Sequence, residues 1–195
     1  MHTEKTIYSK RNKMLNCFKS LRLLSAALLV LSAILLVPTA SAGKIGLPDF
    51  CQALAGSWQG EASRPKGLVK SVRVQGLCSD DRRQLMLSVS EHASHPLSET
   101  WWFREGDGEI KLTYFNGVDA DKYLYFTLYR QETGFSLLGK GLVQQRPAMI
   151  RLNFSPQGSG WLWLQEVQYL DQDDDDYRVY RGIALNPVGE AQQAP

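Results

Sequence analysis

Short apolar runs separated by turn residues are the feature that most restricts the fold of this chain. The runs are centred on Trp58, Val72, Leu87, Trp101, Leu112, Phe126, Leu137, Ile150, Trp163 and Val179. Turn signals such as Asn116-Gly117 lie between them. No segment between two runs has helical periodicity long enough for a crossover helix, which excludes βαβ units. The pattern predicts an all-β fold: a single antiparallel up-and-down barrel of about 8–10 strands over residues 43–185, with a sandwich as the alternative.

Alternation along each run predicts which side chains point inward, because successive side chains of a strand lie on opposite faces. The more apolar face is assigned to the interior. This places Glu99, Trp101, Phe103, Tyr114 and Phe126 inside the barrel. The stretch 161–164 is apolar on both faces, so its outer side is either covered, for example by a second subunit in a homo-oligomer, or simply exposed.

The segment before the first run predicts one short helix. Pro48 suits a first helical turn, and Phe50 and Leu54 are four residues apart on one face. Residues 186–195 carry no strand pattern and are expected to form a flexible tail.

Residues 1–42 have the pattern of a cleaved signal peptide. Basic residues between Lys10 and Arg22 precede an apolar stretch from Leu23 to Val37, and Ala40-Ser41-Ala42 supplies a small-x-small cleavage site. The alternative is a membrane anchor, but the stretch has 15 residues, whereas a bilayer-spanning helix needs about 20. Met14 is an alternative start. We expect a mature chain from Gly43 that is periplasmic or secreted and has no membrane span.

Cysteine and charge content narrow the class further. An exported chain with two remaining cysteines, Cys51 and Cys78, is expected to pair them in a disulfide, with two separate thiols as the alternative. The whole chain carries a net charge of +2, but 16 basic and 19 acidic residues remain without the leader. A mildly acidic domain of this kind has no electrostatic footprint for nucleic acid.

Motifs that would indicate an enzyme or a metal site are weak. No nucleophile elbow, P-loop or zinc-protease motif is present, so the sequence supports no enzymatic activity. Two segments carry possible metal ligands: residues 91–95, with two histidines and a glutamate, and residues 171–176, which are rich in aspartate. A solvated loop is favoured for the first segment and a hydrated hairpin tip for the second, so no metal is expected.

The stretch Leu54-Ala55-Gly56-Ser57-Trp58-Gln59-Gly60-Glu61 resembles the opening strand of calycin (lipocalin-like) barrels, whose signature is G-x-W after a short helix. Together with the stretch 95–104 and the Asp107-Gly108 turn, it is most similar to the nitrobindin-like branch of ten-stranded barrels. The resemblance implies that Trp58 packs at the closed floor of the barrel under an arginine of the last strand, with Arg178 and Arg181 as candidates.

The same resemblance implies haem bound through a histidine near the C-terminus, but this chain has no histidine after His95. We therefore expect no haem and no other cofactor. His92 and His95 lie in a predicted loop, and nothing near Tyr114 is arranged to ionise it as an iron ligand.

Two functions remain from the sequence. The first is an exported binding protein that holds a small, mostly apolar ligand in the barrel, contacted by Trp58, Glu99, Trp101, Phe103, Tyr114, Phe126 and Arg181. In this interpretation Glu99, alone or together with Arg181, fixes the polar head of the ligand. A structural ion pair of Glu99 with Arg151 or Arg181 is the alternative. The second function is an interaction protein with a filled barrel, which binds a protein or glycan through Trp102, Tyr123, Tyr125 and Tyr129.

Overall fold

The structure is a computed structural model, and it describes residues 43–91, 98–173 and 175–189. The leader, the histidine-bearing segment 92–97 and the last six residues lie outside these ranges, as does Asp174. The expectations for signal cleavage, for His92 and His95 and for most of the tail therefore fall outside the described residues.

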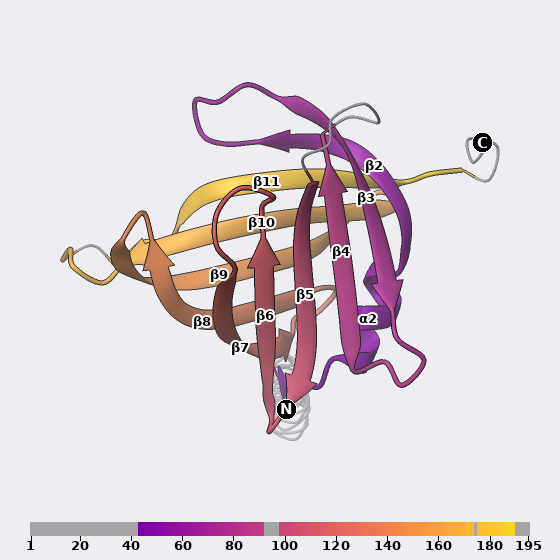
Figure 1. The fold of residues 1–195 in the computed structure, drawn as a ribbon, viewed down its shortest axis with the longest axis horizontal. Coiled ribbons are helices and arrows are strands. Elements are labelled where there is room, and N and C mark those ends of the chain that lie inside the picture. Colours follow the sequence, from indigo (N-terminus) through magenta and orange to yellow (C-terminus); the bar gives the residue numbers. More distant parts are fainter. Residues whose placement is uncertain (1–42, 92–97, 174, 190–195) are drawn as a thin grey trace, which may run out of the picture. The chain divides into compact units, whose positions relative to one another are not determined.

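Ten antiparallel strands close into one barrel, as the run pattern predicts (Figure 1). Each strand pairs with the next, and the last pairs with the first, from Gly182 opposite Ser63 to Pro187 opposite Trp58. A two-residue strand, β1 (Gly43–Lys44), adds to the edge of β7. The barrel strands are β2 (Gly56–Ser63), β3 (Lys70–Cys78), β4 (Gln84–Ser90), β5 (Ser98–Gly106), β6 (Glu109–Phe115), β7 (Lys122–Arg130), β8 (Phe135–Val143), β9 (Arg146–Gln157), β10 (Gly160–Tyr169) and β11 (Arg178–Pro187).

The strand faces also agree with the alternation in the sequence. Trp101, Phe103 and Phe126 are buried, at 3%, 0% and 1% exposure, whereas Tyr123 and Tyr125 on the opposite face are more than half exposed. One boundary differs from the expectation. Strand β11 continues to Pro187, past residue 185, because pairing with β2 extends that far.

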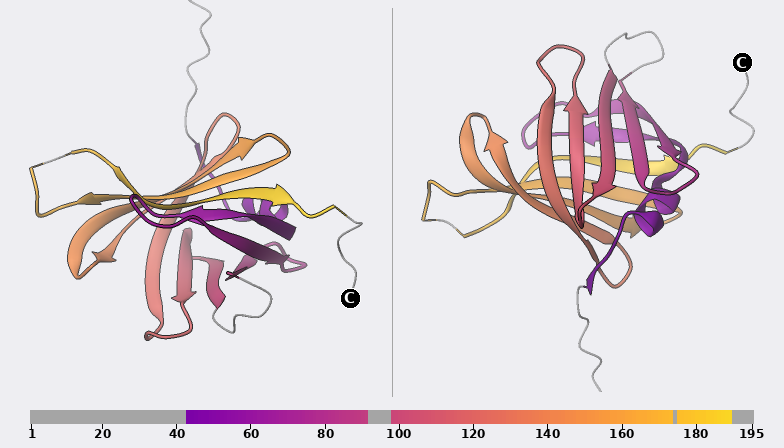
Figure 2. Two further views of the ribbon diagram at one scale, coloured as in Figure 1. Left: turned by 90° about the horizontal axis from the view of Figure 1, so that it is seen from above. Right: turned by 60° about the horizontal axis from the view of Figure 1, so that its bottom comes forward.

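Within the described ranges one helix, α2 (Pro48–Leu54), closes one end of the barrel (Figure 2). Pro48 in its first turn and the four-residue spacing of Phe50 and Leu54 predict this helix. Its Phe50 is fully buried. The Phe50 ring packs edge-on against the rings of Phe103, Phe135 and Phe154, with centroid distances of 5.6, 5.3 and 4.8 Å. We call this end the helix end and the opposite end the mouth.

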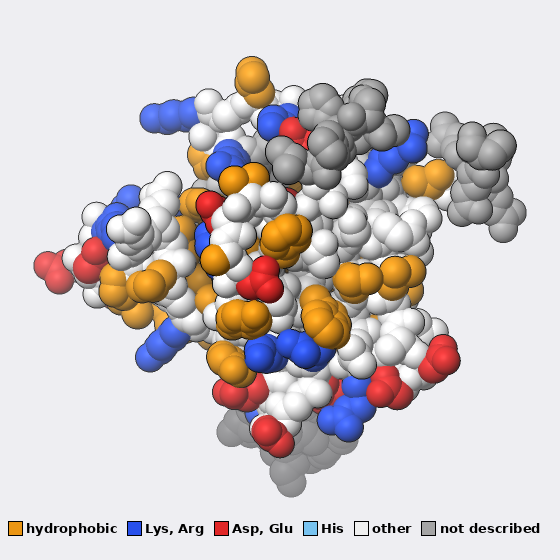
Figure 3. Space-filling view, viewed as in Figure 1, with side chains coloured by type: hydrophobic (Ala, Val, Ile, Leu, Met, Phe, Trp, Pro, Cys, Tyr) orange, Lys and Arg blue, Asp and Glu red, His pale blue; other side chains and the backbone are white. Residues whose placement is uncertain are grey.

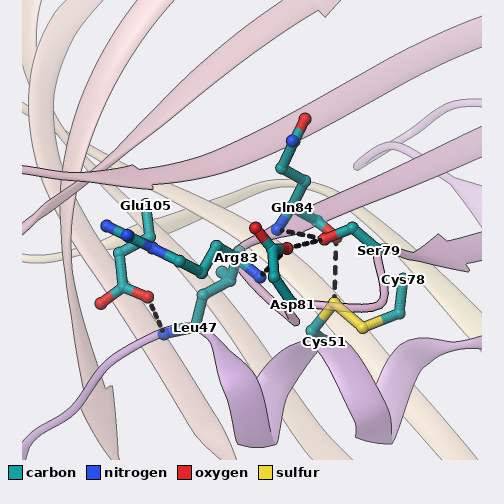
Figure 4. The surroundings of a disulfide bond; sticks show 8 residues. All are labelled: Leu47, Cys51, Cys78, Ser79, Asp81, Arg83, Gln84 and Glu105. Atoms are coloured by element: carbon teal, nitrogen blue, oxygen red, sulfur yellow. Dashed lines mark hydrogen bonds between the residues drawn. A yellow bond between two sulfur atoms is a disulfide. The ribbon is translucent and has the colours of Figure 1, made fainter.

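The predicted disulfide joins α2 to the barrel wall. Cys51, in the helix, is bonded to Cys78, the last residue of β3, and the two Cα atoms are 5.4 Å apart (Figure 4). Gly76 makes this approach possible, because a Cβ there would lie 2.0 Å from the carbonyl oxygen of Leu54. The backbone amide of Leu47 also donates to Glu105, 3.3 Å away, at the end of β5. Covalent, packing and polar contacts thus all hold the helix in place.

No helix within the described ranges is long and apolar enough to cross a membrane.

Candidate ligand cavity at the mouth of the barrel

A cavity of about 500 Å³ opens at the mouth. Its lining residues lie at the ends of β2, β4 and β6, at the starts of β3, β5 and β11, and on β10. These strand ends and starts are the ones remote from α2. The apolar part of its wall consists of Ala62, Leu68, Val72, Val89, Trp101, Trp163 and Ile183. This volume falls in the range of small-molecule sites, and the small residue Ala62 contributes to the space.

An ion pair between Glu99 and Arg181 lines the same cavity. One Arg181 nitrogen, Nη1, donates to both Glu99 oxygens, at 3.0 and 2.8 Å, and Nε donates to Gln165 Oε1 at 2.8 Å. The side chains are 17% (Arg181) and 30% (Glu99) exposed. The indole nitrogen of Trp101 also donates to Glu99, at 3.3 Å. The pair expected with Arg181 is therefore present, while Arg151 binds Glu166 on the outer face.

Aromatic rings surround the guanidinium of Arg181. Its central carbon lies 4.6 Å from the ring centroid of Trp101 and 5.3 Å from that of Tyr114. The Trp101 ring in turn packs edge-on against Tyr114 and Trp163. Burial raises the pKa of the Tyr114 hydroxyl, and the Glu99 carboxylate adds to this while Arg181 opposes it. The aromatic faces help to hold the guanidinium of Arg181 beside the Glu99 carboxylate at the cavity.

The described residues of this cavity do not fit haem. Its lining contains no histidine, cysteine, methionine or tyrosine among the residues described. Both cysteines of the barrel are in the disulfide, and the raised pKa of Tyr114 favours a neutral phenol over an iron-binding phenolate.

The other side chains predicted to contact a ligand lie elsewhere in the interior. Phe103 and Phe126 are fully buried in the core and do not line the cavity, and the Phe103 ring contacts Phe50 of the helix. Trp58 is half-buried at the helix end, where its indole nitrogen donates to the carbonyl oxygen of Leu54 at 3.1 Å. The structure thus brings Glu99, Trp101 and Arg181 together at the cavity, with Tyr114 against Trp101.

The expectation that an arginine of the last strand covers Trp58 is wrong for Arg181, which covers Trp101. The register explains the difference, because Trp58 pairs with Pro187, near the end of β11, whereas Arg181 pairs with Gln165. Arg178 pairs with Val167, still farther from the level of Trp58.

Gln165 and Trp163 are contributors that the sequence reasoning missed. Both lie on the inner face of β10, but Leu162 and Leu164 on the outer face are only partly exposed. The strand is therefore apolar on both sides, and alternation alone could not assign its faces. The signal that could have found Gln165 is its position two residues after Trp163, on the same face.

Acidic side chains do not form a metal site in the part of the chain that the structure describes, where no group of three possible ligands comes together. Asp171 instead accepts two hydrogen bonds from Arg146, at 2.9 and 2.6 Å. Glu91 forms an ion pair with Lys70 at the rim of the cavity, at 2.7 Å.

A row of aromatic and apolar side chains crosses the outside of the barrel. Pairing aligns Leu77, Met86, Trp102, Thr113 and Tyr123 side by side from β3 to β7. Arg104 lies over the ring of Trp102 and Lys111 over that of Tyr123, at 4.0 and 4.9 Å. Figure 3 shows hydrophobic side chains beside a basic group on this face.

No protein-family model matches the chain, and no curated protein is similar enough to be counted as a relative. The class therefore follows from the geometry alone. A closed ten-stranded antiparallel barrel with a short helix at one end is compatible with the calycin, lipocalin-like fold.

Proposed function

We propose that this protein is an exported, lipocalin-like binding protein that holds a small, mostly apolar molecule in the mouth cavity. The observation that carries the proposal is the cavity itself: about 500 Å³, walled largely by apolar and aromatic side chains, with the Glu99–Arg181 ion pair in its lining and the Lys70–Glu91 pair at its rim. Ligand sites typically combine such a wall with a few placed polar groups. The similarity to nitrobindin-like barrels is part of the same proposal, with a ligand other than haem.

The ion pair gives the expected ligand one polar end. Glu99 and Arg181 are partly exposed and lie at the cavity. A ligand hydroxyl can accept from the guanidinium or donate to the Glu99 carboxylate, and a ligand carboxylate can accept from the guanidinium. Fatty, isoprenoid or aromatic molecules with such a head fit this lining. Export is supported by the disulfide, because such bonds persist in oxidising compartments.

Tryptophan emission provides the direct test, since Trp101 and Trp163 both line the cavity. We expect stoichiometric quenching by some member of a panel of long-chain alcohols, acids and isoprenoids, and no Soret shift on titration with haem. Native mass spectrometry of protein purified from its own host would reveal a co-purified molecule. No quenching by any compound would contradict the proposal, and a tight haem complex would contradict its choice of ligand.

A matched pair of variants locates the binding. Ala62→Leu adds bulk inside the cavity, whereas Ala184→Leu makes the same change on the neighbouring strand, where the side chain borders an outer hollow. We expect Ala62→Leu to weaken quenching at least about tenfold because its added methyl groups occupy ligand space. Ala184→Leu should leave quenching unchanged.

The outer row from Leu77 to Tyr123 supports a second candidate, binding of a protein or glycan. Aromatic faces with neighbouring cations are typical of such surfaces, and Tyr123 and Tyr125 are exposed there. Trp102→Ala with Tyr123→Ala should then abolish binding to the partner and leave ligand quenching intact, which is the reverse of the result expected for Ala62→Leu.

A further inference from the structure

The turns at the two ends of the barrel differ in chemistry. At the helix end the turns 79–83, 107–108, 131–134 and 158–159 contain only polar residues and glycine. At the mouth, the β2–β3 turn, residues 64–69, has the sequence Arg-Pro-Lys-Gly-Leu-Val. Its Leu68 and Val69 are 85% and 61% exposed. Two large apolar side chains therefore project into solvent beside the opening of an apolar cavity.

Cations flank these two apolar side chains. Arg64 and Lys66 precede them and Lys70 follows, and Lys70 is paired with Glu91. Among the described residues no carboxylate lies within 4.0 Å of the charged groups of Arg64 or Lys66. The turn is thus basic in a domain whose residues 43–195 carry 16 basic and 19 acidic side chains. Figure 3 shows hydrophobic and basic side chains along the top edge, where the β2–β3 hairpin lies.

The backbone of the turn places the apolar pair directly after its tip. The amide of Gly67 donates to the carbonyl oxygen of Arg64 at 2.8 Å, and Lys66 has a φ of 62°, in the left-handed region. This tight turn ends just before Leu68 and Val69. Leu68 then borders the mouth cavity, whereas Val69 and Pro65 border an outer hollow of about 360 Å³ whose wall also includes Leu162 and Leu164.

We propose that the β2–β3 turn docks onto an anionic lipid surface, inserting Leu68 and Val69 while Arg64 and Lys66 contact lipid headgroups. The guanidinium carbon of Arg64 lies 6.0 Å from the ring centroid of Tyr180, a contact that leaves its charge without an anionic partner among the described residues. Apolar side chains beside such cations match the interface of a membrane with anionic lipids. A protein partner would require a broader surface, of about 800 Å² per partner, than this narrow turn offers. Docking would set the cavity mouth against the bilayer, so that an apolar ligand enters without crossing water.

The docking goes beyond the proposed function and does not require it, since the turn could bind lipid even if the cavity held nothing. The chain from Gly43 is suitable for the test, because it contains every strand and the helix that the structure describes, both cysteines of the disulfide and the hydrophobic core. The apolar leader, which would bind vesicles by itself, is thereby absent.

The experiment is flotation with vesicles of phosphatidylcholine, alone or with about one third phosphatidylglycerol. We expect partitioning onto the anionic vesicles to be at least about tenfold stronger than onto the neutral ones, and to fall as salt is raised. The variant Lys66→Glu/Val69→Ser should lose roughly tenfold or more of this binding. Neither residue lines the cavity.

The matched control, Lys140→Glu/Leu142→Ser, makes the same charge change and a similar apolar loss at exposed positions of β8, outside the turn. We expect it to bind vesicles within about twofold of the unmodified chain. Equal binding to both kinds of vesicle, equal binding by the turn variant, or no binding by the unmodified chain would overturn the inference. A concentration-dependent dimer lost in the turn variant, without vesicle binding, would overturn it in favour of contact between copies.

Ligand quenching in vesicle-free buffer separates this inference from the proposed function. The turn variant should be quenched like the unmodified chain. If no variant is quenched but vesicle binding follows the turn, the docking is supported and the ligand function is refuted. If quenching is normal but vesicles are not bound, the docking is refuted and the ligand function is supported.

Discussion

The helix end and the mouth of the barrel are built from the same ten strands but are filled in different ways. At the helix end, Phe50 of α2 enters the barrel and meets three other phenylalanine rings, and the disulfide fastens the helix to β3. At the mouth, the ion pair of Glu99 and Arg181 and a cavity of about 500 Å³ occupy the corresponding region. One end is packed by apolar side chains, and the other leaves space beside a charged pair.

The difference shows how one barrel can combine a stable core with an adaptable site. Close packing at the helix end provides hydrophobic stabilisation that does not depend on a ligand. The mouth is less closely packed and contributes less hydrophobic stabilisation. The Glu99–Arg181 ion pair compensates for only part of this difference, because charges are costly to bury. Stability and binding should therefore be separable by mutation, and the four predictions below test that separation in order of decreasing effect.

The largest effect is expected from Phe50→Ala. Removing a fully buried ring that contacts three others should destabilise the fold by about 3–5 kcal/mol, through lost burial and the cavity left behind. Denaturant unfolding measures the change. Phe115→Ala at the mouth is the control, because that side chain is 44% exposed, and it should cost less than about 1 kcal/mol. Equal costs at both positions would contradict the contrast between the two ends.

The second effect concerns the disulfide. Cys51→Ala/Cys78→Ala removes a link across 27 residues, which should cost roughly 3–4 kcal/mol by the chain-entropy estimate. The bond lies at the helix end, so ligand quenching at the mouth should be preserved under conditions where the variant is folded. Thiol labelling of the unreduced, unfolded protein checks that the bond forms in the parent chain. Loss of ligand binding in the folded variant would show that the two ends are coupled.

The third effect concerns the ion pair, and it should appear in binding more than in stability. Because both side chains are partly exposed, breaking the pair should cost only about 1–2 kcal/mol. Glu99→Gln leaves Arg181 without its anionic partner, so ligands with a carboxylate head should bind more tightly, on the order of fivefold. Ligands with an amine head should bind more weakly, and long-chain alcohols should change little.

Arg181→Gln is the reciprocal variant and should reverse the preference between acid and amine heads. If all three head groups respond alike to both substitutions, the pair acts through the structure of the barrel and does not contact the ligand. Thermal unfolding of both variants provides the accompanying check that they remain folded.

The fold could be predicted from local patterns, because alternation and turn residues act over a few positions. Trp101 and Phe103 were placed inside, and Phe50 on a short helix, from spacing alone. The disulfide could be predicted from two cysteines that remain after a leader with the pattern of an export signal. The strand faces and the helix require only residues close together in the sequence, and the disulfide requires only the cysteine count and the expected compartment.

The cavity could not be predicted in the same way, because it depends on register between distant strands. Arg181 binds Glu99 across 82 residues of sequence. The sequence left both Arg151 and Arg181 open as partners of Glu99. The pairing of β11 with β10 and β2 places the Arg181 cation over Trp101, and this register cannot be derived from the sequence of β11 alone. Both faces of β10 carry apolar side chains, so alternation alone did not assign Trp163 to the interior, and the position of Gln165 on the same face as Trp163 could be used only once that face was known. Phe126 shows the converse, since its inward face was predicted but its place in the packed part of the barrel was not.

The smallest effect is expected from surface carboxylates, and it compares the two ends by their response to acid. At the mouth, hydrogen bonds from Arg146 hold the pKa of Asp171 below its usual value. At the helix end, the Ser79 hydroxyl and the Arg83 amide do the same for Asp81. A depressed pKa in the folded state stabilises the protein above the usual pKa, and this contribution is lost as the pH falls through the folded value.

Asp171→Asn and Asp81→Asn should therefore each be less stable than the parent near neutral pH, and the differences should shrink as the pH falls below about 4. Because both groups are on the surface, the losses should be small and of similar size, in contrast to Phe50 and Phe115. Thermal unfolding of the three proteins across this pH range is the measurement. A much larger acid effect for one variant would show that its end of the barrel is held by charge to an extent that the packing contrast does not explain.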